Sequence, residues 1–587
     1  MLKLLKNFTK KDWLIVAISL LLIIFQVWLD LKLPDYMSEI TKLVQTEGSQ
    51  MSDVLKQGGY MLACAFGSLI AAIVVGYLTS LLSASFTLHV RKKLFENVEN
   101  FGMQEIKKFS TSSLITRTTN DITNVQMLIS MGLQLLIKSP ITSVWAVIKI
   151  LNKNWQWSAL TGIAVLVLMS CVSLLVALVL PRFKKVQKMI DNINELTREN
   201  LTGIRVVRAF NAERYQEDKF EVGNTELTNT QMFNQRAMSA MSPVIYLVMN
   251  TLTLSIYFVG SRLIDSASMM DKLPLFADMV VFSSYAMQVI MSFLMLAMIF
   301  IMYPRAQVSA QRIAEVLDTK PSIKDGKVNS DETDKKGEIE FKNVSFKYPD
   351  GDDYVLKNIS FTAHQGETVA IIGSTGSGKT TMINLIPRFY DATEGTILVD
   401  GVDVKDYNQE FLHNKLGYVP QKAVMFSGSV NYNVAYGDNG KDEISEDTIK
   451  KAVKIAQAEE FVEKMPEKYE AHVAQGGTNL SGGQKQRLAI ARAIARNPEI
   501  YIFDDSFSAL DYKTDYTLRE ELRNYTKDST NIIVAQRIGT ILNADQIIVL
   551  ENGECVGMGT HKELLSNCKV YQEIAYSQLS KEELENG

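Results

Sequence analysis

The sequence predicts an α-helical membrane domain followed by an α/β domain with a phosphate-binding loop. Residues 1–310 hold long apolar stretches, whereas residues 330–587 have the mixed pattern of a soluble domain. In the second part, the octapeptide GSTGSGKT at 373–380 matches the P-loop pattern and directly follows an apolar strand. The chain has 587 residues, which is too long for one ordinary domain.

Composition excludes two classes of protein. The net charge is -4, so the chain lacks the basic excess of a nucleic-acid-binding protein. Its four cysteines are scattered, two in apolar stretches and two in the second domain, which predicts reduced thiols and no disulfide framework. The first apolar run, Trp13 to Leu33, is longer than the core of a secretion signal and is expected to be a transmembrane helix.

Six apolar stretches are long enough to cross a bilayer, which needs about 20 residues per helix. They lie at about 13–34, 56–84, 127–151, 157–180, 243–264 and 275–303. Lys and Arg are concentrated in the loops 85–126 and 181–242, whereas the loops 35–54 and 152–156 carry one lysine each. Positive charge marks the cytoplasmic side, so both termini are expected there.

The predicted domains are a membrane domain at 1–318, a linker at 319–337, an α/β domain at 338–577 and a tail at 578–587.

The two charged loops are rich in helix-forming residues, so we expect the membrane helices to continue well beyond the bilayer. The last span carries a row of methionines on one helix face: Met287, Met291, Met295, Met298 and Met302. Such a row suits either an adaptable wall for apolar ligands or plain helix packing. Asp30 and Asp278 are candidates for contacting a cationic substrate, or for a wet helix end or a bond to a neighbouring helix.

The P-loop supplies a phosphate and metal site. Its glycines let backbone N–H groups surround phosphates at a helix N-terminus. Lys379 is expected to contact the β- and γ-phosphates, and the Thr380 hydroxyl to bind Mg²⁺. Asp504 ends a second apolar strand and is expected to supply the carboxylate for that metal. The predicted phosphate-binding residues are Gly373, Ser374, Thr375, Gly376, Ser377, Gly378, Lys379, Thr380 and Thr381.

The segment Leu480-Ser481-Gly482-Gly483-Gln484 resembles the signature of ABC nucleotide-binding domains. Together with the six spans and the two long loops, it makes the whole chain resemble an ABC exporter. That resemblance implies an ABC-type fold for the second domain, with ATP and Mg²⁺ as cofactors. It also implies short transverse coupling helices near 109–117 and 212–220, which dock on nucleotide-binding domains.

The resemblance assigns roles to further residues. Tyr348 matches the aromatic residue that stacks on adenine, and Gln421 matches the glutamine that touches Mg²⁺. Residues 508–511 match the D-loop. Ser481, Gly482, Gly483 and Gln484 would complete the ATP site of a second domain, because in this family two domains pair head to tail.

Two positions depart from the family pattern. Asp505 stands where a glutamate activates water, and Gln536 stands where a histidine is expected. Aspartate is one methylene shorter, and glutamine cannot carry a proton or a positive charge as histidine can. The predicted catalytic set is therefore Lys379, Gln421, Asp504, Asp505 and Gln536, with Thr380, Gln421 and Asp504 as the metal-binding set. We expect the site to bind ATP and to hydrolyse it slowly.

These observations predict one half of a heterodimeric ABC exporter of amphipathic small molecules, in a bacterial plasma membrane and in contact with its lipids. The expected partner is a second half-transporter with the consensus Glu and His. No nucleic-acid partner is expected. Three alternatives remain open: a lipid or peptide exporter, a homodimeric exporter, and a nucleotide-gated membrane protein that does not transport.

Overall fold

The structure is a computed structural model, and it describes residues 4, 6, 8–46, 48–151, 154–331, 333–437, 440 and 443–579. Most of the predicted tail, 580–587, lies outside the described residues. The chain divides into two compact units. One holds Met1–Glu99 and Ser112–Thr319; the other holds Asn100–Thr111 and Lys320–Gly587. The segment between α3 and α5, residues 100–111, is thus part of the second unit.

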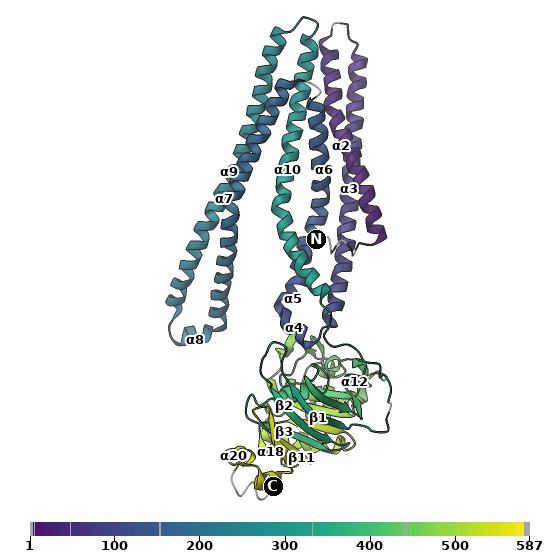
Figure 1. Ribbon diagram of the computed structural model, residues 1–587, viewed down its shortest axis with the longest axis vertical. Coiled ribbons are helices and arrows are strands. Elements are labelled where there is room, and N and C mark those ends of the chain that lie inside the picture. The colour runs from purple at the N-terminus through teal and green to yellow at the C-terminus, as the bar shows by residue number, and fades with distance from the viewer. Residues whose placement is uncertain are drawn as a thin grey trace. The chain divides into compact units, whose positions relative to one another are not determined.

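The first unit is helical (Figure 1). Its elements are α2 (Lys10–Gln45), α3 (Met51–Glu99), α5 (Thr111–Thr118), α6 (Asn120–Leu151), α7 (Trp155–Thr202), α8 (Ile204–Ala209), α9 (Glu213–Ser266) and α10 (Lys272–Asp318). Six helices of the described residues are long and apolar enough to cross a membrane, and each contains one predicted span. The 54 residues of α9 extend about 80 Å, well beyond a bilayer of about 45 Å with its headgroups. The predicted helical extensions are confirmed.

The long helices pack in pairs: α2 with α3, α6 with α10, and α7 with α9 (Figure 1). Trp157, Phe282 and Tyr285 are fully buried in the core between them. Asp30 lies between helices, where Lys138 approaches its carboxylate to 3.1 Å and the Ser68 hydroxyl donates to it at 2.5 Å. Asp30 is therefore bonded to neighbouring helices, which is the last of the three roles expected for it.

Each of the two loops holds a short helix, near the predicted location in the first loop and earlier in the chain than predicted in the second. In the first loop, α4 (Met103–Phe109) belongs to the second unit, and α5 follows it over Thr111–Thr118. In the second loop, the short helix is α8, whereas 212–220 starts α9, so that location was wrong. Gly203, which follows α7, and Asn211, whose φ is +52°, break the helix on either side of α8. The location 212–220 was taken from the resemblance to the family, which does not show where such backbone breaks fall.

The second unit contains three sheets. Its strands are β1 (Ile339–Phe346), β2 (Leu356–Ala363), β3 (Thr368–Gly373), β4 (Glu394–Val399), β5 (Val402–Asp403), β6 (Leu416–Val419), β7 (Gly428–Ser429), β8 (His472–Val473), β9 (Ile500–Asp504), β10 (Thr530–Val534), β11 (Gln546–Glu551) and β12 (Glu554–Gly559). The order in the largest sheet is β12-β11-β3-β10-β9-β6, and only β12 runs antiparallel. The antiparallel sheet β2-β1-β4-β5 and the small pair β7-β8 complete the strands of the described residues.

Helices surround these sheets, as expected for an α/β domain. They are α11 (Lys379–Asn384), α12 (Gln409–Asn414), α13 (Val430–Val434), α14 (Glu446–Ile455), α15 (Glu459–Glu463), α16 (Gly482–Arg496), α17 (Tyr512–Tyr525), α18 (Ile538–Ile541), α19 (His561–Asn567) and α20 (Lys569–Gln578), with 3-10 turns at Lys468–Glu470 and Gln475–Gly477. The strand β9 is buried along its whole length, which explains its apolar run.

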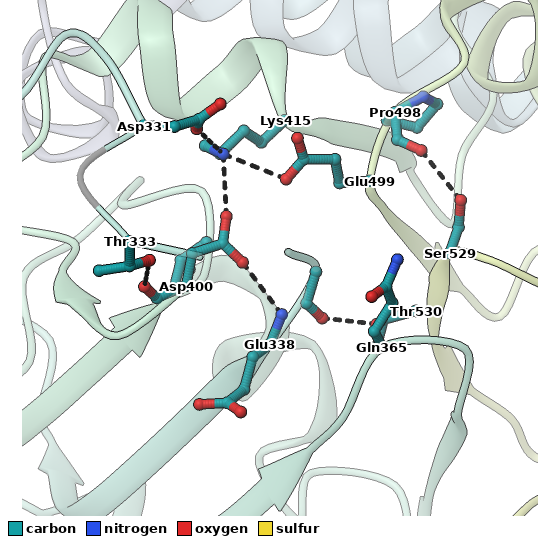
Figure 2. A network of polar contacts seen from close by, with 12 residues as sticks. Asp331, Thr333, Glu338, Gln365, Asp400, Lys415, Pro498, Glu499, Ser529 and Thr530 are labelled. Carbon is teal, nitrogen blue, oxygen red and sulfur yellow. Dashed lines mark hydrogen bonds and ion pairs between the residues drawn. The ribbon is translucent and has the colours of Figure 1, made fainter. Parts of the chain in front are cut away.

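The segment predicted as a linker is attached to the α/β domain. Val328 pairs with Tyr407, and the Thr333 hydroxyl donates to the Asp400 carbonyl oxygen. The Lys415 ammonium lies among three carboxylates, at 2.6 Å from Asp331, 2.9 Å from Asp400 and 3.1 Å from Glu499 (Figure 2). The side chain of Lys415 is 5% exposed and that of Asp400 is 4% exposed. The buried pair of Lys415 with Asp400 lies within the domain, and the half-exposed Asp331 joins the linker to it.

Candidate active site

The P-loop joins β3 to α11, and its backbone requires glycine. Gly378 has a φ of +99°, and a Cβ on it would lie 2.7 Å from a Leu356 methyl carbon. A Cβ on Gly373 would lie 2.1 Å from the Leu550 carbonyl oxygen. No other residue type fits at these two positions without moving the neighbouring strand and loop. The loop therefore keeps its N–H groups at the start of α11, as the motif predicts.

The predicted site residues come from the carboxyl ends of four neighbouring parallel strands. The P-loop follows β3, Gln536 follows β10, Asp504 ends β9, and Gln421 follows β6. In open parallel sheets this edge is where ligands bind. The Thr380 hydroxyl donates to the Asp504 carboxylate at 2.9 Å, which brings two of the three predicted metal ligands together.

Asp505 is restrained by the two glutamines beside it. The Gln536 amide donates to Asp505 Oδ2 at 2.8 Å, and the Gln421 amide approaches the same oxygen at 3.4 Å. The backbone of Asp505 is in the left-handed region, with a φ of +47°, and its N–H donates to the Val534 carbonyl oxygen at 3.0 Å. The carboxylate that would activate water is thus held by the side chain that replaces the expected histidine.

Burial shifts the pKa values of three charged residues in this site. It raises the pKa of Asp504, although the hydrogen bond from Thr380 acts in the opposite direction. It also raises the pKa of Asp505, against the hydrogen bonds from Gln421 and Ser508. Burial lowers the pKa of Lys379, and the nearby carboxylates of Asp505 and Asp504 oppose that shift. The Lys379 ammonium donates to the carbonyl oxygens of Gly373 and Ser374 at 2.8 and 2.7 Å.

Tyr348 lies at the other end of the same site. Its hydroxyl forms a hydrogen bond of 3.0 Å with the Thr381 hydroxyl in the first turn of α11. Tyr390 meets its ring edge-on, with 5.3 Å between ring centroids. The aromatic residue predicted to stack on adenine and the helix predicted to hold phosphates are therefore in direct contact.

The signature residues belong to a separate part of the domain. Ser481 caps α16, because its hydroxyl accepts from the Gln484 N–H while the Gln484 side chain accepts from the Ser481 N–H. Gly482 and Gly483 form the first turn of this helix. The structure thus brings together the P-loop, Asp504, Asp505, Gln421, Gln536 and Tyr348, and places Ser481 to Gln484 elsewhere.

The hydrogen-bond donors and metal ligands of this site fit a nucleoside triphosphate with Mg²⁺. The Ser377 hydroxyl is buried in the P-loop and has no hydrogen-bond partner among the described residues, so it is a donor for a phosphate oxygen. The P-loop N–H groups and Lys379 would hold the phosphates, and Thr380 and Asp504 would hold the metal, which neutralises charge developing on the transferred phosphoryl group.

Comparison with known proteins decides the family. Residues 16–293 match the ABC transporter transmembrane region, and residues 356–508 match the ABC transporter family. An uncharacterized ABC transporter ATP-binding protein of Mycobacterium tuberculosis is 38% identical over 96% of both chains. The chain is an ABC exporter. An ATP-dependent lipid A-core flippase of Pseudoalteromonas translucida is 32% identical over 90% of each chain.

A solved structure shares the exporter's fold. A bacterial Atm1-family ABC exporter with ATP bound matches 95% of this chain and 97% of its own, with a TM-score of 0.78 and 24% identity. The predicted fold class, the transport ATPase activity and the cofactors ATP and Mg²⁺ are confirmed.

Sequence reasoning missed two charged residues near Tyr348 in this exporter. Asp350 follows Tyr348 closely in an acidic turn, and its carboxylate pairs with Lys107, more than 200 residues away in the chain. The acidic turn was visible in the sequence. Its partner was not, because one lysine among many in a charged loop carries no signal of what it contacts.

Proposed function

We propose that this chain is one half of a heterodimeric exporter whose own ATP site binds Mg²⁺ and ATP but hydrolyses slowly. The observation that supports this proposal is the hydrogen bond of 2.8 Å between Gln536 and Asp505. An amide donor on the carboxylate makes it a weaker base toward water. The glutamine itself can donate to a γ-phosphate but cannot carry the charge of a protonated histidine.

The partner's active site is completed by this chain's signature. Ser481 and the N–H groups of Gly482 and Gly483 stand at the N-terminus of α16, a position that favours an anionic phosphate. In this arrangement the partner supplies the consensus Glu and His. Both termini lie in the cytoplasm, and ATP binding draws the two nucleotide-binding domains together. The membrane in this proposal is the bacterial plasma membrane, because the relatives are proteins of bacteria.

The test compares the chain alone with the chain co-purified with a second half-transporter that carries the consensus Glu and His. We expect the pair to hydrolyse ATP about 10²-fold faster than the chain alone, because only the pair holds a consensus base. Ser481→Ala in this chain should lower turnover of the pair by about 10²-fold, since it removes a donor aimed at the γ-phosphate.

Ser445→Ala is the matched control, because Ser445 caps α14 in the same way that Ser481 caps α16. Loss of a cap alone costs only about 1 kcal/mol of stability. Equal turnover by the chain alone and by the pair would contradict the heterodimer, and full activity of the Ser481→Ala pair would contradict the shared site.

Amphipathic small molecules are the substrate class that we propose. In α10, the side chains of Met291, Met295 and Met298 are exposed on one helix face, and this chain leaves them uncovered. Flexible, polarizable side chains suit varied apolar ligands. A lipid is the second candidate, because relatives that are 31% and 32% identical are named lipid A-core flippases.

Transport by the reconstituted pair separates the two substrate classes. We expect ATP-dependent uptake of a hydrophobic cationic dye into inside-out proteoliposomes, and a several-fold loss of uptake when Met291, Met295 and Met298 are replaced by serine. Met269→Ser and Met270→Ser, at exposed methionines just before α10, are the controls. Movement of a fluorescent phospholipid without dye uptake would favour the lipid exporter instead.

A further inference from the structure

Lys107, in the intracellular helix α4, reaches the segment that would bind adenine. Its ammonium lies 2.7 Å from a carboxylate oxygen of Asp350 and 5.3 Å from the centroid of the Tyr348 ring. Both contacts lie within one compact unit, because residues 100–111 belong with the nucleotide-binding domain. A cation within about 6 Å of an aromatic face is attracted by the ring's quadrupole.

The helix α4 is fixed by contacts other than those of Lys107. The Glu105 side chain is buried and accepts hydrogen bonds from the Ser322 N–H at 3.2 Å, the Ser322 hydroxyl at 3.3 Å and the Gly102 N–H at 3.0 Å. Phe101 and Phe109 are buried and stack on one another at 5.8 Å. Because these contacts hold the helix, the ion pair with Asp350 is not needed merely to attach it.

Tyr348 is held on several sides. Its hydroxyl bonds to Thr381 at 3.0 Å, and the rings of Phe346 and Tyr390 meet it edge-on at 5.0 and 5.3 Å. The hydrogen bond to Asp350 raises the pKa of Lys107, so this lysine remains a cation at neutral pH. A cation paired with Asp350 and close to the ring adds an electrostatic restraint on where the ring lies.

We infer that Lys107 is a positioning residue of this chain's own ATP site, which fixes the Tyr348 ring for stacking on the base of the nucleotide. The inference rests on the proposed role of Tyr348 as the adenine-stacking residue. Asp350 orients the ammonium, and the ammonium orients the ring. Affinity for the base therefore depends on a residue that enters the site from the intracellular loop between two membrane helices.

A comparison of two ligands tests this inference. ATP has a base to stack, whereas inorganic triphosphate presents the same phosphates without one. In the full-length chain with Mg²⁺, Lys107→Met should weaken ATP binding about 3- to 10-fold and leave triphosphate binding unchanged, as measured by calorimetry. Lys107→Arg, which keeps the cation, should restore ATP affinity. Lys108→Met is the matched control, since Lys108 lies over Phe109 and not over Tyr348.

A Tyr348→Ala variant tests the stacking role of Tyr348 separately from the positioning role of Lys107. This variant should weaken ATP but not triphosphate, and Lys107→Met should then add no further loss, because both changes act through one ring. Unchanged ATP binding in Tyr348→Ala would overturn the stacking role itself. Two outcomes would overturn the role of Lys107 alone. In the first, Tyr348→Ala weakens ATP binding as expected but Lys107→Met does not. In the second, Lys107→Met weakens the binding of ATP and of triphosphate equally.

Discussion

Replacing Asp505 by Glu together with Gln536 by His is expected to raise ATP turnover by this chain alone about 10²-fold. Glutamate places its carboxylate about 1.5 Å farther out than aspartate, and a misplacement of about 1 Å can change a rate by that factor. The second change removes the amide that donates to Asp505 Oδ2 at 2.8 Å and introduces a side chain that can carry a proton.

Each change alone is expected to give less than the pair, because the two side chains share one hydrogen bond and their effects are coupled. Steady-state release of phosphate from the purified chain measures the gain. Adding Lys379→Ala should abolish it, which assigns the new activity to this P-loop. An Asp505→Glu and Gln536→His variant with unchanged turnover would mean that neither position limits hydrolysis.

Lys415→Met is expected to destabilise the nucleotide-binding domain by about 3 kcal/mol. The substitution leaves the carboxylate of Asp400, 4% exposed, without its counter-ion, and removing one partner of a buried pair costs about 3–5 kcal/mol. Asp331 and Glu499 are more exposed, so water screens their charges and their share is smaller.

The pH dependence of this contribution follows from the shift at Lys415. Burial opposes the ammonium, but its hydrogen bonds to Asp331 and Asp400 outweigh burial and raise the pKa of Lys415. The stabilisation is therefore complete below the unfolded pKa of about 10.4 and declines only as pH rises through the higher folded value. The stabilisation that the Lys415 charge gives to the wild type should therefore stay constant from about pH 6 to pH 8.

Hydrogen exchange across β6 (Leu416–Val419) measures this effect, because the five tryptophans all lie in the membrane half and cannot report it. Lys405→Met is the control, since Lys405 is an exposed lysine nearby. Adding Asp400→Asn to Lys415→Met should recover part of the loss, because it removes the charge left unpaired. Equal protection in Lys415→Met and wild type would contradict a stabilising pair.

The sequence was a good guide wherever a motif ends a strand. Asp504, Gln421 and Gln536 each follow an apolar run, and the parallel order of β3, β10, β9 and β6 brings them to one edge. The hydrogen bond between Gln536 and Asp505 could not be predicted in this way. It depends on the left-handed backbone at Asp505 and on two side-chain rotamers, which no spacing encodes.

Polar contacts between residues far apart in the chain could not be predicted from the sequence either. The segment after Lys320 is rich in charge and was predicted to be a linker, yet backbone pairing of Val328 with Tyr407 and the ion pair of Asp331 with Lys415 attach it to the domain. Charged composition is typical of both free and attached segments, because it does not show which charges find partners. The same limit applied to Lys107 and Asp350.

The attachment of residues 100–111 and of the segment after Lys320 to one compact unit has a consequence for building chimeric transporters. The nucleotide-binding module of this chain is discontinuous in the gene. A module exchanged between two exporters at Gly337 would separate Asp331 from Lys415, and one exchanged at Lys320 would still separate Glu105 from Ser322. A chimera therefore needs both segments, residues 100–111 and the part of the chain after Lys320, from the same parent exporter.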